Sequence, residues 1–255
     1  MATVSNRETT IVSLVTYRRP EWAVEIIRRC LEEPDCEVWV TSNCDGFTSG
    51  HEESCGGGER LRVWRPGKNL GAGGGRNLHL RDRPLGVPFL RLDDDVLMVR
   101  PGWLSRLHKV RMWNRAAVVR ISTDVEEGCF YPRRPHANGS YLVSGECADA
   151  LGGFYLGFGG TVLDDVEYSF RAAVWAREGC SGGIFEYGEP YEDLCRSRAG
   201  GIGGGWLVPE GLFTERASEL LSGVSPLFVP YDSPRRPGWA QRDAGLPDRE
   251  REFDW

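Results

Sequence analysis

The feature that most constrains this chain is the alternation of strand-forming and helix-forming segments through its first half. Thr10–Val15 and Cys36–Thr41 are rich in β-branched residues, and the segment between them, from Pro20, carries apolar residues at helical spacing. The same alternation continues, with strands expected at 61–64, 87–92 and 116–121 and helices at 70–83 and from 101. Short connections between such elements favour parallel pairing. We therefore expect an α/β fold with a mostly parallel central sheet flanked by helices.

The second half of the chain is less regular. Residues 122–160 carry many glycines and turn formers around a strand-like segment at 141–143, and residues 164–177 have a clear helical pattern. From residue 226 the chain is rich in proline, arginine and aspartate, which is typical of extended segments. We expect a single domain over residues 1–228 and an extended C-terminal tail over residues 229–255.

Composition narrows the possible partners and compartment. The 255 residues contain no apolar stretch of membrane-spanning length and no signal-peptide pattern, so we expect a cytoplasmic protein without an integral membrane segment. A net charge of −6 argues against nucleic acid as a partner. Arginine is nevertheless concentrated between residues 60 and 91, which suits a small phosphorylated ligand. The eight cysteines form no C-x-x-C pair, and we expect reduced thiols.

Three consecutive aspartates, Asp93, Asp94 and Asp95, directly follow the predicted strand at 87–92. Carboxylates this close repel one another, and burying them is unfavourable unless a cation or strong donors are present. Mg²⁺ and Mn²⁺ suit clustered carboxylates and usually share their ligands with substrate phosphates. An isolated acidic triplet would more simply be a solvated turn. Here the triplet lies at the carboxyl end of a strand, where parallel sheets bind their ligands.

A glycine-rich segment, Gly-Ala-Gly-Gly-Gly-Arg-Asn at residues 71–77, opens a predicted helix. Helix N-termini with unhindered backbone attract phosphates. The segment superficially resembles a dinucleotide-binding fingerprint, but it follows the third predicted strand instead of the first. The first strand ends in Thr-Tyr-Arg-Arg-Pro, and the chain has no G-K-[ST]. The sequence therefore argues against a Rossmann dehydrogenase and against a Walker A loop.

Five motifs occur in a characteristic order. They are V-S-L-V-T-Y-R-R-P from residue 12, Asp45-Gly46, N-L-G-A-G-G-G-R-N from residue 69, L-R-L-D-D-D-V from residue 90 and L-D-D-V-E-Y-S-F-R from residue 163. In this order they resemble the family 2 glycosyltransferases, nucleotide-sugar-dependent enzymes of the GT-A fold. The resemblance covers roughly residues 9–175. It implies a nucleotide-sugar-binding half at about 9–122 and an acceptor half at about 123–228.

The resemblance implies which residues hold the nucleoside of the donor. Thr16, Tyr17 and Arg18, at the end of the first strand, would frame the nucleotide base. Asp45 would hydrogen-bond the base or the ribose. From local sequence alone, a carboxylate in an Asp-Gly turn explains Asp45 equally well.

The resemblance also implies the diphosphate and metal ligands. Asn69 and Arg76 match the segment that contacts the diphosphate, and a guanidinium can donate two hydrogen bonds to a phosphate. Asp95 and Asp93 match the metal-binding D-x-D motif, with Asp93 or Asp94 left to bind ribose or a metal-bound water. The expected cofactor is Mn²⁺ or Mg²⁺, which would neutralise charge on the departing diphosphate.

The last motif implies the catalytic residue. Asp165 matches the general base that takes a proton from the acceptor, and partial burial would raise its pKa for that role. Aspartate replaces the usual glutamate at position 164, so the base is either Asp165 or Asp164. A helix cap explains Asp164 without catalysis, because Glu167 three residues on would complete a capping box. Arg171 fits the family's trailing arginine or an exposed helix charge.

Two further residues are candidates outside the five motifs. Trp206 ends a glycine-rich segment at 200–205 that could act as a lid over donor and acceptor. The alternative is a connector whose tryptophan packs on the core. His136 could add a metal ligand, although the chain has no H-x-H or H-x-D spacing.

We therefore expect a metal-dependent glycosyltransferase that moves a sugar, with inversion, from a nucleoside diphosphate sugar to a hydroxyl or amine. We expect the donor to be a uridine diphosphate sugar. We expect the acceptor to be a small natural product, a peptide or a glycan. The alternatives are a nucleotidyltransferase acting on a sugar phosphate and a non-catalytic nucleotide-sugar-binding module. The sequence does not indicate an oligomeric state.

Overall fold

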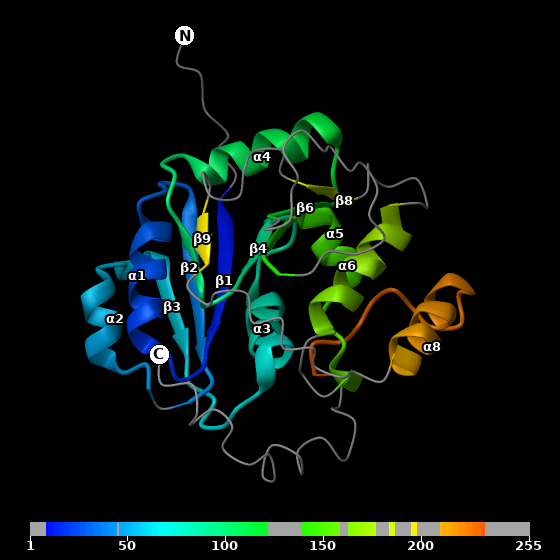
Figure 1. Cartoon of the computed structure of the whole chain (residues 1–255), viewed down its shortest axis with the longest axis horizontal. Coiled ribbons are helices and arrows are strands. Elements are labelled where there is room, and N and C mark those ends of the chain that lie inside the picture. Colours follow the sequence, from blue (N-terminus) through cyan, green and yellow to red (C-terminus); the bar gives the residue numbers. More distant parts are fainter. Residues whose placement is uncertain are drawn as a thin grey trace.

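The computed structural model describes residues 9–44, 46–121, 139–158, 163–176, 184–186, 195–197 and 210–232. Within these residues seven strands form one sheet, in the order β3-β2-β1-β4-β7-β6-β8 (Figure 1). The strands are β1 (Thr10–Thr16), β2 (Cys36–Ser42), β3 (Leu61–Trp64), β4 (Phe89–Leu92), β6 (Val118–Arg120), β7 (Tyr141–Val143) and β8 (Ile184–Glu186). The predicted α/β fold is confirmed.

The strand β1 lies at the centre of the parallel part of the sheet. It pairs in parallel with β2 on one side and β4 on the other, and β2 pairs in parallel with β3. β7 is antiparallel to β4 and β6, and β6 is parallel to β8. The register places Thr16 beside Ser42 and Leu14 beside Leu92. The carboxyl ends of β1, β2 and β4 therefore meet at one edge of the sheet.

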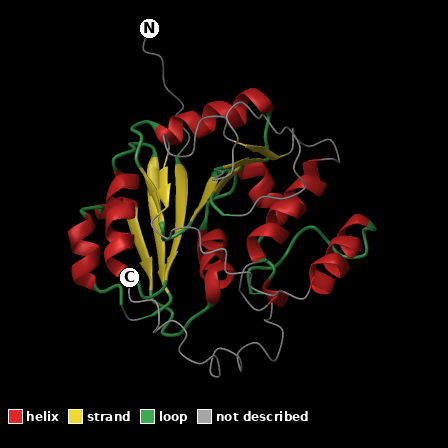
Figure 2. Cartoon of the chain, in the orientation of Figure 1, coloured by secondary structure: helices red, strands yellow, loops and turns green. Residues whose placement is uncertain are grey.

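Helices cover both faces of the sheet (Figure 2). Because strand side chains alternate between faces, Val12 and Leu14 pack in one buried cluster with α1, α2 and α4, and Ile11 packs in a second with α3, α5 and α6. The helices are α1 (Pro20–Leu31), α2 (Ser49–Cys55), α3 (Gly71–Asp82), α4 (Trp103–Asn114), α5 (Gly145–Leu151), α6 (Asp164–Trp175) and α8 (Glu210–Leu221). The two 3₁₀ turns are η1 (Gly58–Arg60) and η2 (Leu156–Phe158).

Two pairings lie outside the central sheet. β5 (Val96–Met98), which follows the aspartate triplet, pairs antiparallel with β9 (Cys195–Ser197). Near the C-terminus, the Val229 N–H donates to Leu151 O (2.9 Å) and Val229 O accepts from the Gly153 N–H (2.6 Å). Val229, the first residue of the expected tail, therefore pairs with the fold, and the domain boundaries themselves stay a prediction.

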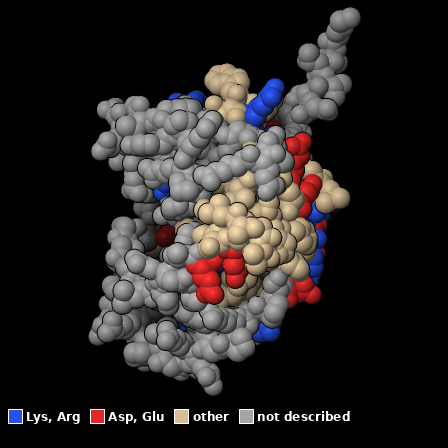
Figure 3. Space-filling view, turned by 90° about the vertical axis from the view of Figure 1, so that its right-hand side faces the viewer, with Lys and Arg blue, Asp and Glu red and all other residues tan. Residues whose placement is uncertain are grey.

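Two general expectations concern the cysteines and membrane-spanning helices. Five cysteines whose side chains the structure describes, Cys30, Cys36, Cys44, Cys55 and Cys147, form no disulfide. Among the described helices, none combines the length and the apolar character needed to cross a membrane. On the face shown in Figure 3, acidic side chains of described residues gather in small groups and basic side chains are scattered between them.

Candidate active site

The aspartate triplet leaves β4 at the edge where β1 and β2 also end. The backbone N–H of Tyr17, one residue past β1, donates to Asp94 Oδ2 at 3.4 Å. The three aspartate side chains are 18–30% exposed, so each combines partial burial with access to solvent. A solvated turn would leave them without such contacts, and the triplet is instead built into the sheet edge.

Asp93 is held by buried arginines. Its Oδ1 accepts from Arg91 Nη1 at 2.8 Å and from Arg76 Nη2 at 3.4 Å, and its backbone N–H donates to Ser140 Oγ at 3.1 Å. Burial alone would raise the pKa of Asp93, but the two guanidiniums outweigh burial and lower it. The charge of Asp93 is therefore matched within the protein.

Asp94 and Asp95 have weaker compensation. Burial, together with Asp95, raises the pKa of Asp94 to about 6. Burial and the charge of Asp93 also raise the pKa of Asp95. The cation beside them is Arg19, whose Nη1 lies 3.7 Å from Asp94 Oδ1 and 3.8 Å from Asp95 Oδ2. These two carboxylates therefore have the stronger need for an added cation.

The glycine-rich start of α3 serves close packing. A Cβ atom on Gly73 would lie 2.6 Å from Asp164 Oδ2, and one on Gly75 would lie 2.9 Å from Val15. Small residues thus let α3 approach both α6 and β1. Arg76 follows on this helix, buried, with Nη2 donating to Leu92 O at 3.0 Å and with Nε and Nη1 making no hydrogen bond.

The second carboxylate pair opens α6. Asp165 is 6% exposed; its Oδ1 accepts from the Val166 N–H (2.8 Å) and its Oδ2 from the Gly139 N–H (2.9 Å). Asp164 is 2% exposed, with Oδ1 accepting from the Asp165 N–H (2.9 Å) and Oδ2 making no hydrogen bond. Burial raises the pKa of Asp165, and burial with the neighbouring Asp165 raises that of Asp164 to about 6.

The expected capping box at the start of α6 is wrong. Leu163 occupies the cap position and makes no side-chain cap, because Asp164 and Asp165 already lie within the helix. Glu167 does not turn back to the helix start but pairs with Arg171, with Nε–Oε2 at 2.9 Å. Arg171 is fully buried, so it is not an exposed helix charge.

Arg91 joins the two carboxylate motifs. From the middle of β4 its Nη1 donates to Asp93 Oδ1 at 2.8 Å, while its Nη2 lies 3.4 Å from Asp165 Oδ2. The same guanidinium donates to Gly139 O and lies over the ring of Tyr141. Two motifs that are far apart in sequence therefore converge on one buried cation.

The other residues predicted to bind the nucleotide-sugar donor lie near the carboxyl ends of the same strands, and they make different contacts. Tyr17 and Arg18 stack on each other, with the guanidinium 4.9 Å from the ring centre. Thr16 is buried, and its hydroxyl makes no hydrogen bond. Asn69 is exposed, and its Oδ1 accepts from the Gly71 N–H at 2.8 Å. The predicted residues that lie outside the described part of the chain are Asp45, His136 and Trp206.

Sequence reasoning missed three residues of this site: Arg19, Asn43 and Arg91. Asn43 connects the strand ends, since its N–H donates to Thr16 O (2.9 Å) and its side chain bonds Leu70 N–H and Gly71 O. For Arg91 a signal existed, because a charged residue inside a buried strand needs a partner. For Arg19 and Asn43 we find no local signal, since loop residues of these types are common.

The residues fit a divalent cation that shares its ligands with a substrate. Within the described ranges, no group of three or more His, Cys, Asp and Glu side chains could enclose a metal by itself. Mg²⁺ and Mn²⁺ commonly use one or two carboxylates together with substrate phosphates. Asp94 and Asp95, with raised pKa values and the loosely held Arg19 as their ion-pair partner, provide such a partial ligand set.

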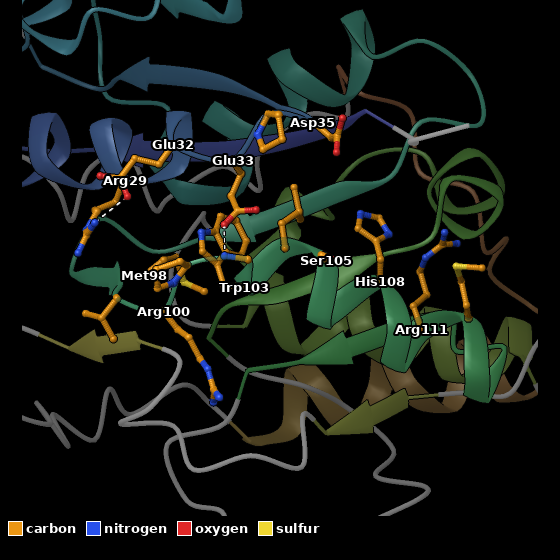
Figure 4. Close-up of a pocket in the computed structure, with 16 residues that line it drawn as sticks. Arg29, Glu32, Glu33, Asp35, Met98, Arg100, Trp103, Ser105, His108 and Arg111 are labelled. Carbon is orange, nitrogen blue, oxygen red and sulfur yellow. Dashed lines mark hydrogen bonds and ion pairs between the residues drawn. The ribbon is translucent and has the colours of Figure 1, made fainter. Parts of the chain in front are cut away.

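A separate cavity of about 990 Å³ lies near the amino-terminal end of β1, between the end of α1 and α4 (Figure 4). His108 in its lining hydrogen-bonds Thr10, the first residue of β1, at 2.7 Å. Glu33 points toward the start of α4, where its Oε1 accepts from the Gly102 N–H at 2.7 Å. This carboxylate is engaged in supporting a helix end, and the cavity lies away from the aspartates.

Comparisons with known proteins identify solved structures that are similar to this chain. No protein-family model and no curated protein matches the chain. Among solved structures, the mannosyltransferase PcManGT from Pyrobaculum calidifontis, in complex with GDP-Man and Mn²⁺, is 17% identical with a TM-score of 0.60, over 85% of this chain and 63% of its own.

Two further solved structures are also similar to this chain. S. aureus TarS 1–349 is 15% identical with a TM-score of 0.55, over 71% of this chain and 58% of its own. GalNAc-T7, solved with UDP, GalNAc and Mn²⁺, is 14% identical with a TM-score of 0.54, over 72% and 43%. The chain thus spans less than two thirds of the length of each protein. At these identities the likeness establishes the fold, and it is the GT-A fold that the sequence predicts.

Proposed function

We propose that this protein is a metal-dependent glycosyltransferase that transfers a sugar from a nucleoside diphosphate sugar to a hydroxyl or amine. The observation that carries the proposal is the convergence of Asp93 and Asp165 on Arg91, with N–O distances of 2.8 and 3.4 Å. This contact brings the candidate donor motif and the candidate base motif into one site. Membership of glycosyltransferase family 2 is part of the proposal.

The solved neighbours support the donor class. PcManGT was solved with GDP-Man and Mn²⁺, and GalNAc-T7 with UDP, GalNAc and Mn²⁺. We propose a uridine or guanosine diphosphate sugar for this chain, with the uridine form as the first to test. The nucleoside would lie against Tyr17 and Arg18, whose stacked side chains directly follow β1.

Asp95 and Asp94 would hold the divalent cation. When bound, Mn²⁺ or Mg²⁺ supplies positive charge that stabilises the departing diphosphate. Because Asp93 is held by Arg91 and Arg76, we now assign it to positioning instead of metal binding. Arg76, buried between Asp93 and Asp164, acts in the same way and does not donate directly to phosphate.

Asp165 is proposed as the general base, and Asp164 as the alternative. Burial raises the pKa of both carboxyls, which increases their basicity when ionised. Asp165 takes the proton from the attacking hydroxyl, and the sugar is transferred by single displacement with inversion. Arg91 orients Asp165 through the 3.4 Å ion pair. The acceptor class, a small natural product, peptide or glycan, stays a proposal.

The test is product formation from nucleotide sugars. Wild-type protein with Mn²⁺ is expected to release UDP or GDP slowly from one nucleotide sugar, even with water as the acceptor. Asp165→Asn should reduce this rate by about 10²- to 10⁴-fold while leaving nucleotide binding intact. Asp95→Asn should remove the dependence on Mn²⁺. The exposed residue Glu32 provides a matched control, and Glu32→Gln should behave as wild type.

Two outcomes would contradict the proposal, and a third would decide between its two candidate bases. Pyrophosphate formed from a nucleoside triphosphate and a sugar phosphate would indicate a nucleotidyltransferase. Nucleotide-sugar binding without any product would indicate a binding module. If Asp164→Asn abolishes turnover and Asp165→Asn does not, the base is Asp164.

A further inference from the structure

The aspartate triplet faces three arginines that are held in different ways. Arg91 and Arg76 are nearly inaccessible, with side chains 7% and 2% exposed, and both donate hydrogen bonds to backbone carbonyls. The Arg19 side chain is 33% exposed. Its ion-pair distances of 3.7 and 3.8 Å are longer than a hydrogen bond. Of these three arginines, Arg19 is therefore the one that can leave its carboxylates without breaking a buried hydrogen bond.

The backbone of Arg19 is fixed although its side chain is not. Arg19 is the cap residue of α1, and its carbonyl accepts from the Ala23 N–H at 3.1 Å. The preceding residue, Arg18, has a φ of +57°, a left-handed conformation that is uncommon for a non-glycine residue. The Arg19 guanidinium also lies 5.1 Å from the ring centre of Trp22, on the outer side of α1. The backbone at Arg19 is thus anchored, and a partly exposed side chain extends from it.

One nitrogen of Arg19 serves two carboxylates. Nη1 is the atom closest to both Asp94 and Asp95, so the guanidinium places its positive charge between them. Without this charge, two half-buried carboxylates would repel each other. A divalent cation bound by the same two aspartates would occupy the same electrostatic role with twice the charge.

We propose that Arg19 is a built-in counter-cation that competes with the divalent metal for Asp94 and Asp95. In the absence of metal, Arg19 keeps the two carboxylates in place; when the metal binds, the Arg19 guanidinium leaves them and turns toward solvent. This inference rests on the proposed function, since it takes the two aspartates as the metal site. It adds that the metal affinity of the free protein is set partly by an arginine.

The test measures Mn²⁺ binding without any substrate. Free Mn²⁺ is followed by its electron paramagnetic resonance signal during titration of wild type, Arg19→Ala and Arg29→Ala. Arg29 provides a matched control because it lies at the other end of α1 and pairs with Glu32 at 2.6 Å. Both substitutions remove one positive charge from the same helix. Exposed ion pairs of ordinary strength predict that Arg19→Ala binds Mn²⁺ about two- to sixfold more tightly, with Arg29→Ala unchanged.

A second measurement tests where the gain arises. Asp95→Asn in the Arg19→Ala background should abolish the tighter binding. In addition, Mn²⁺ should raise the thermal midpoint more in Arg19→Ala than in wild type, because the variant starts without a counter-cation.

Each outcome decides a different claim. Unchanged or weaker Mn²⁺ binding by Arg19→Ala, while wild type binds Mn²⁺ through Asp95, would overturn the role of Arg19 and leave the proposed function standing. Equal tightening by Arg19→Ala and Arg29→Ala would reduce the effect to net charge and also overturn it. If wild type binds no Mn²⁺ with or without nucleotide, both this inference and the metal-dependent function fail.

Discussion

The first turn of α6 carries two buried carboxylates under opposite conditions. Asp164 has one oxygen without a hydrogen bond and a pKa of about 6. Three residues on, Glu167 is fully buried, and its Oε1 and Oε2 lie 3.0 and 2.9 Å from Arg171 Nε. Arg216 of α8 adds a third bond to Glu167 at 3.1 Å. Asp164 is therefore short of partners, whereas both oxygens of Glu167 are paired.

The difference separates two uses of a buried charge. Arg171 extends the second cluster, since its remaining N–H groups donate to the carbonyls of Leu151, Gly153 and Leu227 at 2.7–2.8 Å. A cluster with every group paired stabilises the fold against opening. A carboxylate with a vacant oxygen and raised pKa can accept a proton. Pairing thus distinguishes Glu167, which stabilises the fold, from Asp164, which we propose as the alternative base.

The largest expected effect comes from breaking the paired cluster. Glu167→Gln leaves Arg171 buried without a carboxylate and removes one of the two carboxylate partners of Arg216, the other being Glu219 at 3.5 Å. It should lower the free energy of unfolding by about 3–5 kcal/mol. Urea unfolding measures it. Glu215→Gln, an exposed position on α8, should change stability by less than about 0.5 kcal/mol. A loss below about 1 kcal/mol for Glu167→Gln would show that Glu167 does not differ from Asp164 in what its pairing contributes.

The next effect concerns the unpaired carboxylate and depends on pH. Asp164 has a pKa of about 6 in the fold, against about 4 for an ordinary aspartate, so the folded state favours the protonated form. The stability contributed by that proton is complete below about pH 4 and is lost as the pH rises through 6. Asp164→Asn should therefore stabilise the protein by about 1–3 kcal/mol at pH 8 and much less at pH 4. Thermal unfolding at both pH values tests this.

The control for that experiment is Glu53→Gln, which removes an exposed carboxylate from α2. Its effect should be small at both pH values. If Asp164→Asn destabilises the protein at pH 8, Asp164 is a paired residue like Glu167, and the comparison is wrong.

The smallest effect tests how closely α3 approaches the unpaired carboxylate. Gly73→Ala would place a Cβ 2.6 Å from Asp164 Oδ2 and 3.2 Å from Leu156 Cδ2. The overpacking outweighs the gain in helix propensity, and we expect a net loss of about 1–2 kcal/mol. Gly50→Ala on α2 meets only Thr48 Oγ1 at 3.7 Å and should be neutral or stabilising. Equal behaviour of the two variants in urea unfolding would show that the contact is not tight.

Much of the fold could be predicted because local patterns determine it. The strand at 61–64 and the strand at 141–143 have the predicted bounds, and α6 begins at the predicted Asp164. In these segments, β-branched residues or helical periodicity agree with the tertiary packing. The capping box at Asp164 failed because the same residues, Asp164 and Glu167, also satisfy a helix interior with distant partners.

The site could be predicted only in part, because its residues are selected by long-range contacts. The acidic motifs are visible as runs of aspartate, but their convergence depends on Arg91, an arginine inside a strand. The glycine-rich segment at 71–75 predicts a phosphate-binding start of a helix, and this stays a prediction. The sequence does not reveal that Gly73 and Gly75 also permit close packing of the helix. Arg76 and Arg171 are buried, and the sequence alone does not distinguish a buried arginine from one that faces solvent.

The contacts that connect α6 and its neighbours with the chain up to Val229 have a consequence for biosynthesis. Glu167 and Arg171 gain partners from Arg216 and Leu227, and Val229 pairs with the backbone of Leu151 and Gly153. A ribosome makes these late residues after the rest of the site. Until they emerge, a nascent chain holds α6 with an incompletely paired buried charge. The proposed catalytic helix therefore reaches its final, locked state only after the polypeptide has been synthesised through residue 229.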